Sequence, residues 1–280
     1  MNTEEQWIKC DVENRIDLRI NSVTQPFVFL HITDLHLCEC DDRDAGMQVY
    51  LGRRRIQFNY PERQLERILK QIHDVQPDFV AVTGDLIDSP TKANIEAIQG
   101  LVEKSNVPFY FALGNHEWSN LAVRHNQSHW QEALKVWTSQ DLDWFTVLHK
   151  GVHLLFINNS NYQFSADQLE QTKRLFSKGE ACVVFCHIPV LMEVPQESQG
   201  QLKGSAILVG SRENEKLIRR IHPSTVAFCS LLKTHQSVMS VFAGHVHEAA
   251  SDAFRDGVKQ YICPPAYLGK WQWVSVGDKQ

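Results

Sequence analysis

The sequence has no apolar run long enough to cross a bilayer. Its longest apolar stretches, around Phe27–Leu30 and Cys182–Met192, are far shorter than the roughly 20 residues of a membrane-spanning helix. The N-terminal segment MNTEEQWIKCDVENR is polar and acidic, unlike a secretory signal. The seven cysteines form no CxxC pair, so we expect reduced thiols rather than a disulfide framework. These absences favour a cytoplasmic protein with no membrane partner.

Positive charge is not in excess either. The 28 Lys and Arg residues are outnumbered by 33 Asp and Glu, which gives a net charge of −5, so there is no strong sign of nucleic-acid polymer binding. Internal repeats, low-complexity tracts and linkers rich in Pro, Gly or Ser are also absent. With 43% hydrophobic and 22% charged residues, the composition excludes a disordered or fibrous chain. We expect residues 1–280 to form a single domain.

What the sequence does contain is an alternation of short apolar runs with amphipathic segments. Buried strands are expected at 26–33, 78–84 and 108–114. A helix that opens at Pro61 and another over 91–105 separate them, because their apolar residues recur at helical spacing. Strands that alternate with helices indicate a parallel sheet with right-handed crossovers.

The second half continues the pattern. Strands are expected at 152–158, 182–187 and 240–245, and Ser165 with Gln168 forms a capping box that opens a helix. Asp256-Gly257 indicates a hairpin between two further strands, and 212–235 is expected to be helical. Residues 189–211 are long for a connection and are a candidate lid or specificity loop. Alternation within 1–25 indicates an edge-strand extension.

Side chains that bind metals follow the expected strands, at the points where the strands end. These residues are Asp34, His36, Asp85, Asn115, His187, His245 and His247. Ligands of open α/β sheets bind beyond the carboxyl ends of the strands, so these side chains are expected at one edge. Each of them alone is more often a core histidine, a turn former or a helix cap. The full ordered set is hard to attribute to chance.

The chemistry of this set is coherent. Four imidazoles with three carboxylate or amide oxygens suit first-row transition metals better than Ca²⁺ or Mg²⁺, which favour oxygen alone. Seven ligands are too many for one ion but suit two ions if one carboxylate bridges them. Residues two apart on a strand point to the same face, so both members of each pair, Asp34 with His36 and His245 with His247, can reach one site.

These motifs resemble those of the calcineurin-like metallophosphoesterase superfamily. The five blocks run in order across residues 34–247: Asp34-x-His36, Gly84-Asp85-x-x-Asp88, Gly114-Asn115-His116-Glu117, His187 and Gly244-His245-x-His247. The resemblance implies an α/β fold of four layers, an αββα sandwich in which two mixed β-sheets pack face to face between helices.

The resemblance also implies two divalent transition-metal ions, of Mn, Fe, Zn, Ni or Co. The first ion would be held by Asp34, His36, Asp85 and His247. The second would be held by Asp85, Asn115, His187 and His245, so that Asp85 bridges the two. His116 would act beside the metals as general acid, and Glu117 would orient His116. Asp88 would be structural in its turn.

The activity implied is hydrolysis of a phosphate ester by a metal-bridging hydroxide. A phosphodiester is expected, because no basic residue outside Arg53–Arg55 adjoins a metal motif to neutralise a dianionic monoester. The substrate would be a small phosphate ester or a nucleotide. A phosphomonoesterase, a nucleotide pyrophosphatase and a non-catalytic binding module that retains the fold stay open as alternatives.

Three further features have two interpretations each. Arg53–Arg55 could clamp a substrate phosphate or form a solvated charge run. Trp118 and Tyr267 flank metal motifs and could hold an organic group of the substrate, or could be ordinary core aromatics.

The serine/threonine phosphoprotein phosphatases of the superfamily are set aside, because Asp88 is followed here by Ser89 rather than Arg-Gly.

Overall fold

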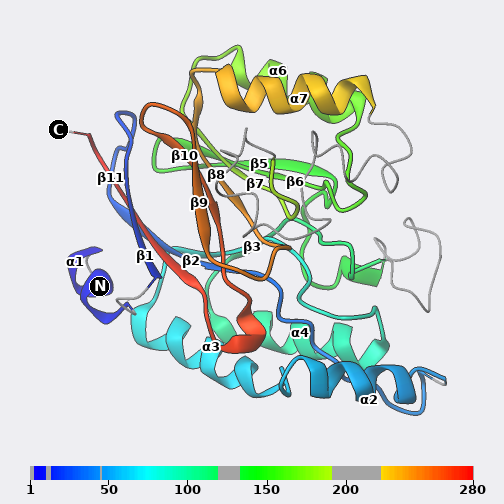
Figure 1. Ribbon diagram of the computed structural model, residues 1–280. Helices are drawn as coiled ribbons and strands as arrows, with labels where there is room; N and C mark the ends of the chain where they lie inside the picture. The colour runs from blue at the N-terminus through cyan, green and yellow to red at the C-terminus, as the bar shows by residue number, and fades with distance from the viewer. Residues whose placement is uncertain (1–2, 11–13, 45, 119–132, 191–221, 280) are drawn as a thin grey trace, which may run out of the picture.

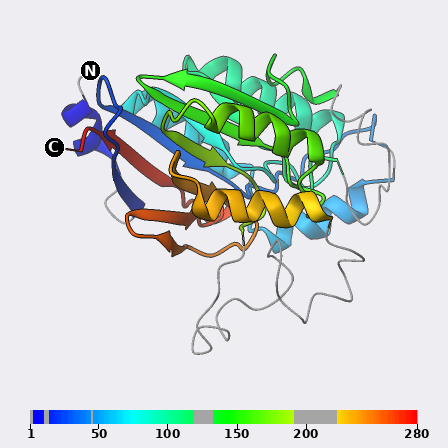
Figure 2. The same cartoon turned by 90° about the horizontal axis from the view of Figure 1, so that it is seen from above.

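The computed structural model describes residues 3–10, 14–44, 46–118, 133–190 and 222–279 (Figure 1). Within these residues, no helix is both long and apolar enough to span a membrane. The described chain forms two β-sheets that lie face to face, with helices on the two outer faces (Figures 1 and 2).

The first sheet has five strands. In spatial order they are β1 (Arg15–Arg19), β11 (Gln272–Gly277), β2 (Phe27–Ile32), β3 (Phe79–Val82) and β4 (Phe109–Phe111). β2, β3 and β4 are parallel, as the sequence predicts, whereas β11 runs antiparallel to β2 and parallel to β1. Four helices accompany this half of the fold: α1 (Thr3–Lys9), α2 (Gln48–Gln57), α3 (Arg63–Val75) and α4 (Lys92–Ser105).

The second sheet has six strands. In spatial order they are β5 (Trp144–His149), β6 (Val152–Ile157), β7 (Cys182–Phe185), β8 (Val238–Ala243), β10 (Val258–Ile262) and β9 (Ala250–Arg255). The central four strands are parallel, and the two edge strands, β5 and β9, are antiparallel to their neighbours. Helices α6 (Ala166–Phe176) and α7 (Pro223–Thr234) cover its outer face (Figure 1).

Side chains of the strands alternate between an inner and an outer core. On β2, Phe27 and Phe29 point into the layer between the sheets, whereas Val28 and Leu30 belong to the core under α3 and α4. Phe29 meets Phe185 of β7 edge to face, with ring centroids 5.6 Å apart. Three apolar layers therefore separate four layers of secondary structure, which confirms the expected αββα sandwich of two mixed sheets.

The short sequence motifs that predicted a helix start and a hairpin turn are confirmed by the structure. Ser165 and Gln168 form the reciprocal capping box at the start of α6. Asp256 and Gly257 form the turn between β9 and β10. The helix expected from Pro61 begins at Arg63. The candidate lid, residues 189–211, lies almost wholly outside the described residues, as does the first part of the helical region expected over 212–235.

Several elements were not expected from the sequence, among them α1, α2, β5 and β11. Hydrophobic periodicity does not predict α2, because the helix buries only Leu51 and has no apolar stripe. β5 is a half-buried edge strand in which Phe145 is the buried residue. β1 pairs with β11 alone and lies at the edge of its sheet.

Candidate metal centre

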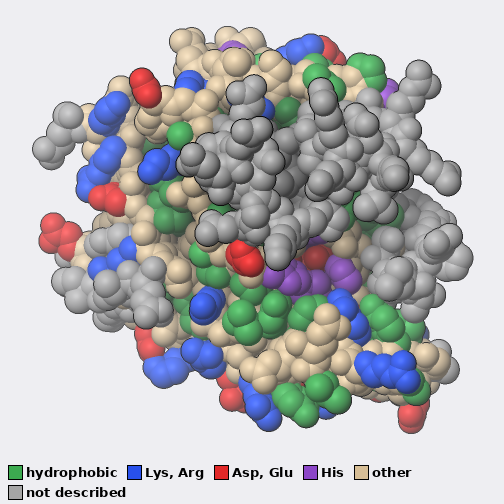
Figure 3. Space-filling model, in the orientation of Figure 1, with side chains coloured by type: hydrophobic (Ala, Val, Ile, Leu, Met, Phe, Trp, Pro, Cys, Tyr) green, Lys and Arg blue, Asp and Glu red, His purple; other side chains and the backbone are tan. Residues whose placement is uncertain are grey.

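The loops that follow β2, β3, β4, β7 and β8 meet at one end of the sandwich, between the two sheets. Parallel strands present their carboxyl ends at the same edge, so the residues after each strand converge there. Histidine side chains gather in one hollow on the face seen in Figure 3. Six of the seven expected ligands form two clusters in this region.

The first cluster joins Asp34 and His36, after β2, to His247, after β8. His36 Nε2 lies 3.0 Å from His247 Nε2. Asp34 Oδ1 lies 3.2 Å from His247 Nε2 and 3.8 Å from His36 Nε2. Asp34 is fully buried and His36 is nearly so, whereas the side chain of His247 is partly exposed, so this cluster is open to solvent on the side of His247.

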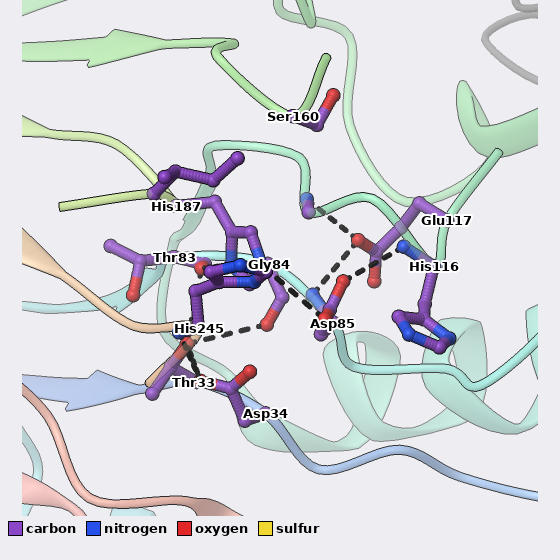
Figure 4. Close-up of polar contacts among 12 residues, drawn as sticks. Thr33, Asp34, Thr83, Gly84, Asp85, His116, Glu117, Ser160, His187 and His245 are labelled. Atoms are coloured by element: carbon purple, nitrogen blue, oxygen red, sulfur yellow. Dashed lines mark hydrogen bonds and ion pairs between the residues drawn. The ribbon is translucent and has the colours of Figure 1, made fainter. Parts of the chain in front are cut away.

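The second cluster contains Asp85, His187 and His245. His187 Nε2 lies 3.3 Å from Asp85 Oδ2 and 3.1 Å from His245 Nδ1. Asp85 Oδ2 is also 3.7 Å from His36 Nε2 of the first cluster. The structure therefore brings Asp85 between the two clusters, and Figure 4 shows its carboxylate facing His187 and His245.

Asn115, the seventh expected ligand, lies beside the second cluster. It precedes His116, whose backbone N–H donates to Asp85 Oδ1 over 2.9 Å. Asn115 Oδ1 is buried without a hydrogen-bond partner in the described residues. A buried oxygen left unpaired costs about 1–3 kcal/mol, so this oxygen calls for a donor or a cation.

A pair of transition-metal ions fits these residues. The facing imidazole nitrogens of each cluster, 3.0 and 3.1 Å apart, can share one proton or one cation. Metal–nitrogen bonds of about 2.1 Å place two ligand nitrogens about 3 Å apart at right angles. The mixture of imidazole with carboxylate or amide oxygens is the donor set of such metals. The unpaired oxygen of Asn115 favours a cation over a shared proton.

Backbone conformation in these loops is unusual. Five of the seven expected ligands have a positive φ: Asp34 (52°), His36 (49°), Asp85 (52°), His245 (69°) and His247 (61°). L-residues avoid this left-handed region, at a cost of about 1–2 kcal/mol each. Adjacent loops hold it in place, since Asp34 N–H donates to Gly84 O and His36 N–H donates to Asp85 O, both over 2.9 Å. Strain is thus concentrated where the ligands stand.

Glycines allow the loops after β3 and β4 to approach one another. A Cβ built on Gly84 would lie 2.3 Å from the backbone nitrogen of Gly114. A Cβ on Gly114 would lie 2.2 Å from Asp85 Oδ1. A larger residue at Gly84 would displace the backbone of Gly114 or the ring of His187, and a larger residue at Gly114 would displace Asp85, so both glycines serve the site directly.

Asp88 connects several groups of the site and does more than form a turn. Its Oδ1 lies 3.2 Å from both His36 Nδ1 and His116 Nδ1. Arg54 of α2 donates to both carboxylate oxygens, from Nε over 2.9 Å and from Nη2 over 2.8 Å. Burial opposes the charged form of Asp88, but the hydrogen bonds from these three side chains hold its pKa well below its usual range.

His116 is poised to carry a proton. Burial lowers its pKa, but the charges of Asp85 and Asp88 outweigh burial and raise the pKa to about 9. Its Nδ1 also lies 3.1 Å from the backbone oxygen of Asp88. Because Nδ1 is engaged in this way, Nε2 is the nitrogen left to act on a substrate.

The resemblance implied that Glu117 would orient His116, but the carboxylate of Glu117 contacts backbone N–H groups instead. Within the described residues, its carboxylate accepts hydrogen bonds from four backbone N–H groups: those of Gly114 (2.7 Å), Asp85 (2.8 Å), Leu86 (2.7 Å) and Ile87 (3.4 Å). Figure 4 shows the carboxylate of Glu117 beside Asp85. Burial, with the charge of Asp85, raises its pKa to about 7. Glu117 therefore ties the loop after β3 to the loop after β4, and Asp88 takes the position beside His116.

A cavity of about 350 Å³ opens onto the clusters. One side consists of Asp85 and four histidines, and the other of Arg54, Gln57, Phe58 and Tyr267. Phe58 stacks on the ring of His36 with centroids 4.1 Å apart and planes 11° apart. Gln57 and Phe58 carried no motif and were not singled out in the sequence. Of the aromatics that were, Tyr267 lines the cavity, whereas Trp118 is not among the described lining residues and donates to Ser160 Oγ.

Comparison with known families gives one match that covers most of the chain. The model described as calcineurin-like phosphoesterase matches residues 27–249. Among curated proteins, 078R of Invertebrate iridescent virus 3, named as a candidate phosphoesterase, is 26% identical over 105 residues. That match covers 36% of this chain and 30% of the viral protein, so the chain aligns with less than a third of that relative.

Solved structures share the fold. A dimetal phosphatase from Danio rerio is 15% identical with a TM-score of 0.57, and the match covers 86% of this chain and 88% of that one. Purple acid phosphatase PPD1 from yellow lupin (Lupinus luteus) seeds is 12% identical with a TM-score of 0.50. That match covers 88% of this chain and 45% of the lupin protein. At these identities, the likeness concerns the fold alone.

Proposed function

The chain belongs to the calcineurin-like phosphoesterase family, whose members act on phosphate esters, and we propose that it hydrolyses phosphodiesters at a dinuclear metal centre. The observation that carries this proposal is the pair of ligand clusters with Asp85 between them. The first ion would be held by Asp34, His36, Asp85 and His247. The second would be held by Asp85, Asn115, His187 and His245.

Two divalent transition-metal ions, when bound, supply a nucleophile from water near neutral pH and neutralise charge on the phosphoryl group. The protein contributes the geometry around them. Asp88 fixes the ring of His36 through Nδ1, and the carbonyl oxygen of Thr83 accepts from His187 Nδ1 over 2.6 Å. Each ring therefore presents Nε2 to its cluster, which is the usual arrangement of a ligand histidine.

His116 is proposed to give its proton to the leaving oxygen. Asp88 holds Nδ1, and His116 lines the cavity, so the proton is transferred from Nε2. The raised pKa of His116, about 9, keeps the proton available near neutral pH. General acid catalysis of this kind contributes about 10²–10⁴-fold.

The charges around the cavity support a diester substrate. Arg54 is its one lining Lys or Arg among the described residues, and Asp88 already neutralises it with two hydrogen bonds. Among the described lining residues, a dianionic monoester would find no Lys or Arg that is free of a carboxylate partner. Tyr267 is partly exposed in the cavity and packs on the buried ring of Phe58, with ring centroids 5.0 Å apart, so it offers an aromatic surface for a second ester arm.

The experiment compares kcat/KM for bis-p-nitrophenyl phosphate and p-nitrophenyl phosphate with Mn²⁺-loaded protein. We expect the diester to be preferred. A preference of more than about tenfold for the monoester, about 1.4 kcal/mol, would overturn the diester assignment. Binding of two metal ions without turnover of either substrate would instead favour a non-catalytic binding module.

A phosphomonoester is the second candidate, because Arg54 does reach the cavity. Turning away from Asp88, its guanidinium could clamp a phosphoryl group. Arg54→Gln should then reduce kcat/KM far more for the monoester than for the diester. Arg53→Gln is the matched control, since Arg53 is on the same helix and exposed.

We also propose that residues 1–280 act as one domain in the cytoplasm. All seven cysteines are unpaired and six of them are buried, which suits a reducing compartment. Limited proteolysis tests the single domain: a stable fragment much shorter than the whole chain would contradict it. Localisation of a tagged chain in cells tests the compartment, and secretion would overturn the proposal.

A further inference from the structure

Tyr162 contacts a proposed metal ligand, although it belongs to none of the sequence motifs. It lies between β6 and α6, and its hydroxyl oxygen is 3.2 Å from His245 Nε2. The tyrosine ring meets the His245 ring edge to face, with centroids 5.6 Å apart and planes 77° apart. Both the position and the plane of the imidazole are therefore set by Tyr162.

The opposite nitrogen of His245 faces the second cluster. His245 Nδ1 lies 3.1 Å from His187 Nε2, and His245 belongs to the group formed with Asp85 and His187. A neutral imidazole carries its proton on one nitrogen and has a lone pair on the other. His245 can give a lone pair to the cluster through Nδ1 only if Nε2 carries the proton.

We propose that Tyr162 is a positioning residue that accepts a hydrogen bond from Nε2–H of His245 and so keeps Nδ1 free to bind the second metal ion. The inference rests on the proposed dinuclear centre and identifies a residue that controls one of its two sites. Tyr162 does for His245 what Asp88 does for His36 and Thr83 does for His187. In each case the partner fixes which nitrogen faces the cluster.

The backbone of His245 makes such support necessary. Its φ of 69° is left-handed, and its N–H donates to Asp34 Oδ2 over 2.8 Å. That bond fixes the main chain but leaves the side-chain torsions free. The hydroxyl of Tyr162 is the contact that restrains the far end of the ring.

The first test is a titration of metal-free Tyr162→Phe with Co²⁺, with wild type alongside. Wild type should bind two ions. In the variant, the ion at Asp85, Asn115, His187 and His245 should bind about 10–100-fold more weakly, with the other ion unchanged. Tyr110→Phe is the matched control: Tyr110 is also half-buried, and its ring packs against Phe79, Phe145 and Phe156. Thermal unfolding of the metal-free proteins checks that both variants fold.

The second test needs no substitution at Tyr162. In ¹⁵N-histidine spectra of the wild type loaded with Zn²⁺, His245 should be protonated at Nε2 and not at Nδ1, with the signal assigned by its loss in His245→Gln. Protonation at Nδ1, or unchanged Co²⁺ affinity in Tyr162→Phe, overturns the role of Tyr162 alone. Binding of fewer than two ions by wild type overturns the dinuclear centre, and this inference with it.

Discussion

At the scale of single residues, Asp85 should have the widest effect on metal binding. Its Oδ2 lies between the two clusters, 3.7 Å from His36 Nε2 and 3.3 Å from His187 Nε2. Asp85→Ala should therefore lose both ions, whereas His36→Ala should chiefly weaken the first. Elemental analysis after dialysis against trace metal measures the stoichiometry. An Asp85→Ala protein that retains two ions would show that the carboxylate is not shared.

His116→Ala should separate chemistry from metal binding. His116 is placed beside the clusters but is proposed to carry a proton rather than to bind metal. The variant should keep two ions, and its kcat should fall about 10²–10⁴-fold on an alkyl phosphodiester with a poor leaving group. Nitrophenolate needs little protonation as it leaves, so kcat for bis-p-nitrophenyl phosphate should fall by a smaller factor. Equal losses on both substrates would rule out the leaving-group role.

The convergence of the proposed ligands could be predicted from the sequence, because the fold brings the ends of parallel strands together. Apolar runs mark the strands, and parallel strands end at one edge, so Asp34, Asp85 and His187 had to meet. The partner of His116 could not be predicted in the same way. Glu117 is adjacent in sequence, but a turn at Asn115 aims it at backbone N–H groups, and Asp88 reaches His116 from another loop.

At the scale of elements, continuous apolar runs were predicted well and half-exposed elements poorly. β2, β6 and β7 are buried along their whole length, so their sequences carry the signal directly. α2 packs against Cys38 and its neighbours through Leu51 and through Phe58, which directly follows the helix. With so little buried area, it has no readable periodicity, yet it supplies Arg54 and Gln57 to the cavity.

The capping box of α6 gives a prediction at this scale. Ser165 Oγ accepts from the backbone N–H of Gln168, and the Gln168 side chain accepts from the backbone N–H of Ser165. Ser165→Ala should lower the free energy of unfolding by about 1 kcal/mol, measured by urea denaturation. Ser177→Ala, at the other end of α6, is the control and should change it by less than about 0.5 kcal/mol. Equal effects would contradict a specific contribution from the cap.

At the scale of the whole molecule, Asp78 links the two sheets. Its Oδ2 accepts from Val28 N–H of β2 over 3.1 Å. Its Oδ1 accepts from Lys150 Nζ and lies 3.4 Å from His149 Nε2, both contributed by the second sheet. Asp78 precedes β3, so this contact lies at the end of the sandwich opposite the clusters and acts on stability rather than on the site.

Asp78 also gives the molecule a predictable pH dependence. Burial opposes its charged form, but hydrogen bonds from His149, Lys150 and Val28 lower its pKa below the usual value. Its stabilising contribution is therefore fully present above about pH 4, the ordinary carboxyl pKa, and is lost as pH falls through the lowered pKa. Asp78→Asn should cost about 1.5–3 kcal/mol at pH 7, and the difference from wild type should shrink at acid pH.

Urea denaturation of both proteins from pH 3 to 7 measures this change. Asp74→Asn is the matched control, because Asp74 pairs with Lys70 on the exposed face of α3. Exposed pairs of this kind contribute about 0.3–0.5 kcal/mol. A difference between Asp78→Asn and wild type that is constant over the whole pH range would show that the carboxylate charge is not involved.

The left-handed backbone at five proposed ligands has a consequence for how this chain can evolve. Glycine at position 34, 36, 85, 245 or 247 would relieve about 1 kcal/mol of backbone strain. Selection for heat resistance alone would thus enrich glycine at the positions where the proposed metal centre needs a ligand side chain. Descendants that become more robust and keep their chemistry must gain that robustness in the sheets and helices, away from the ligand loops.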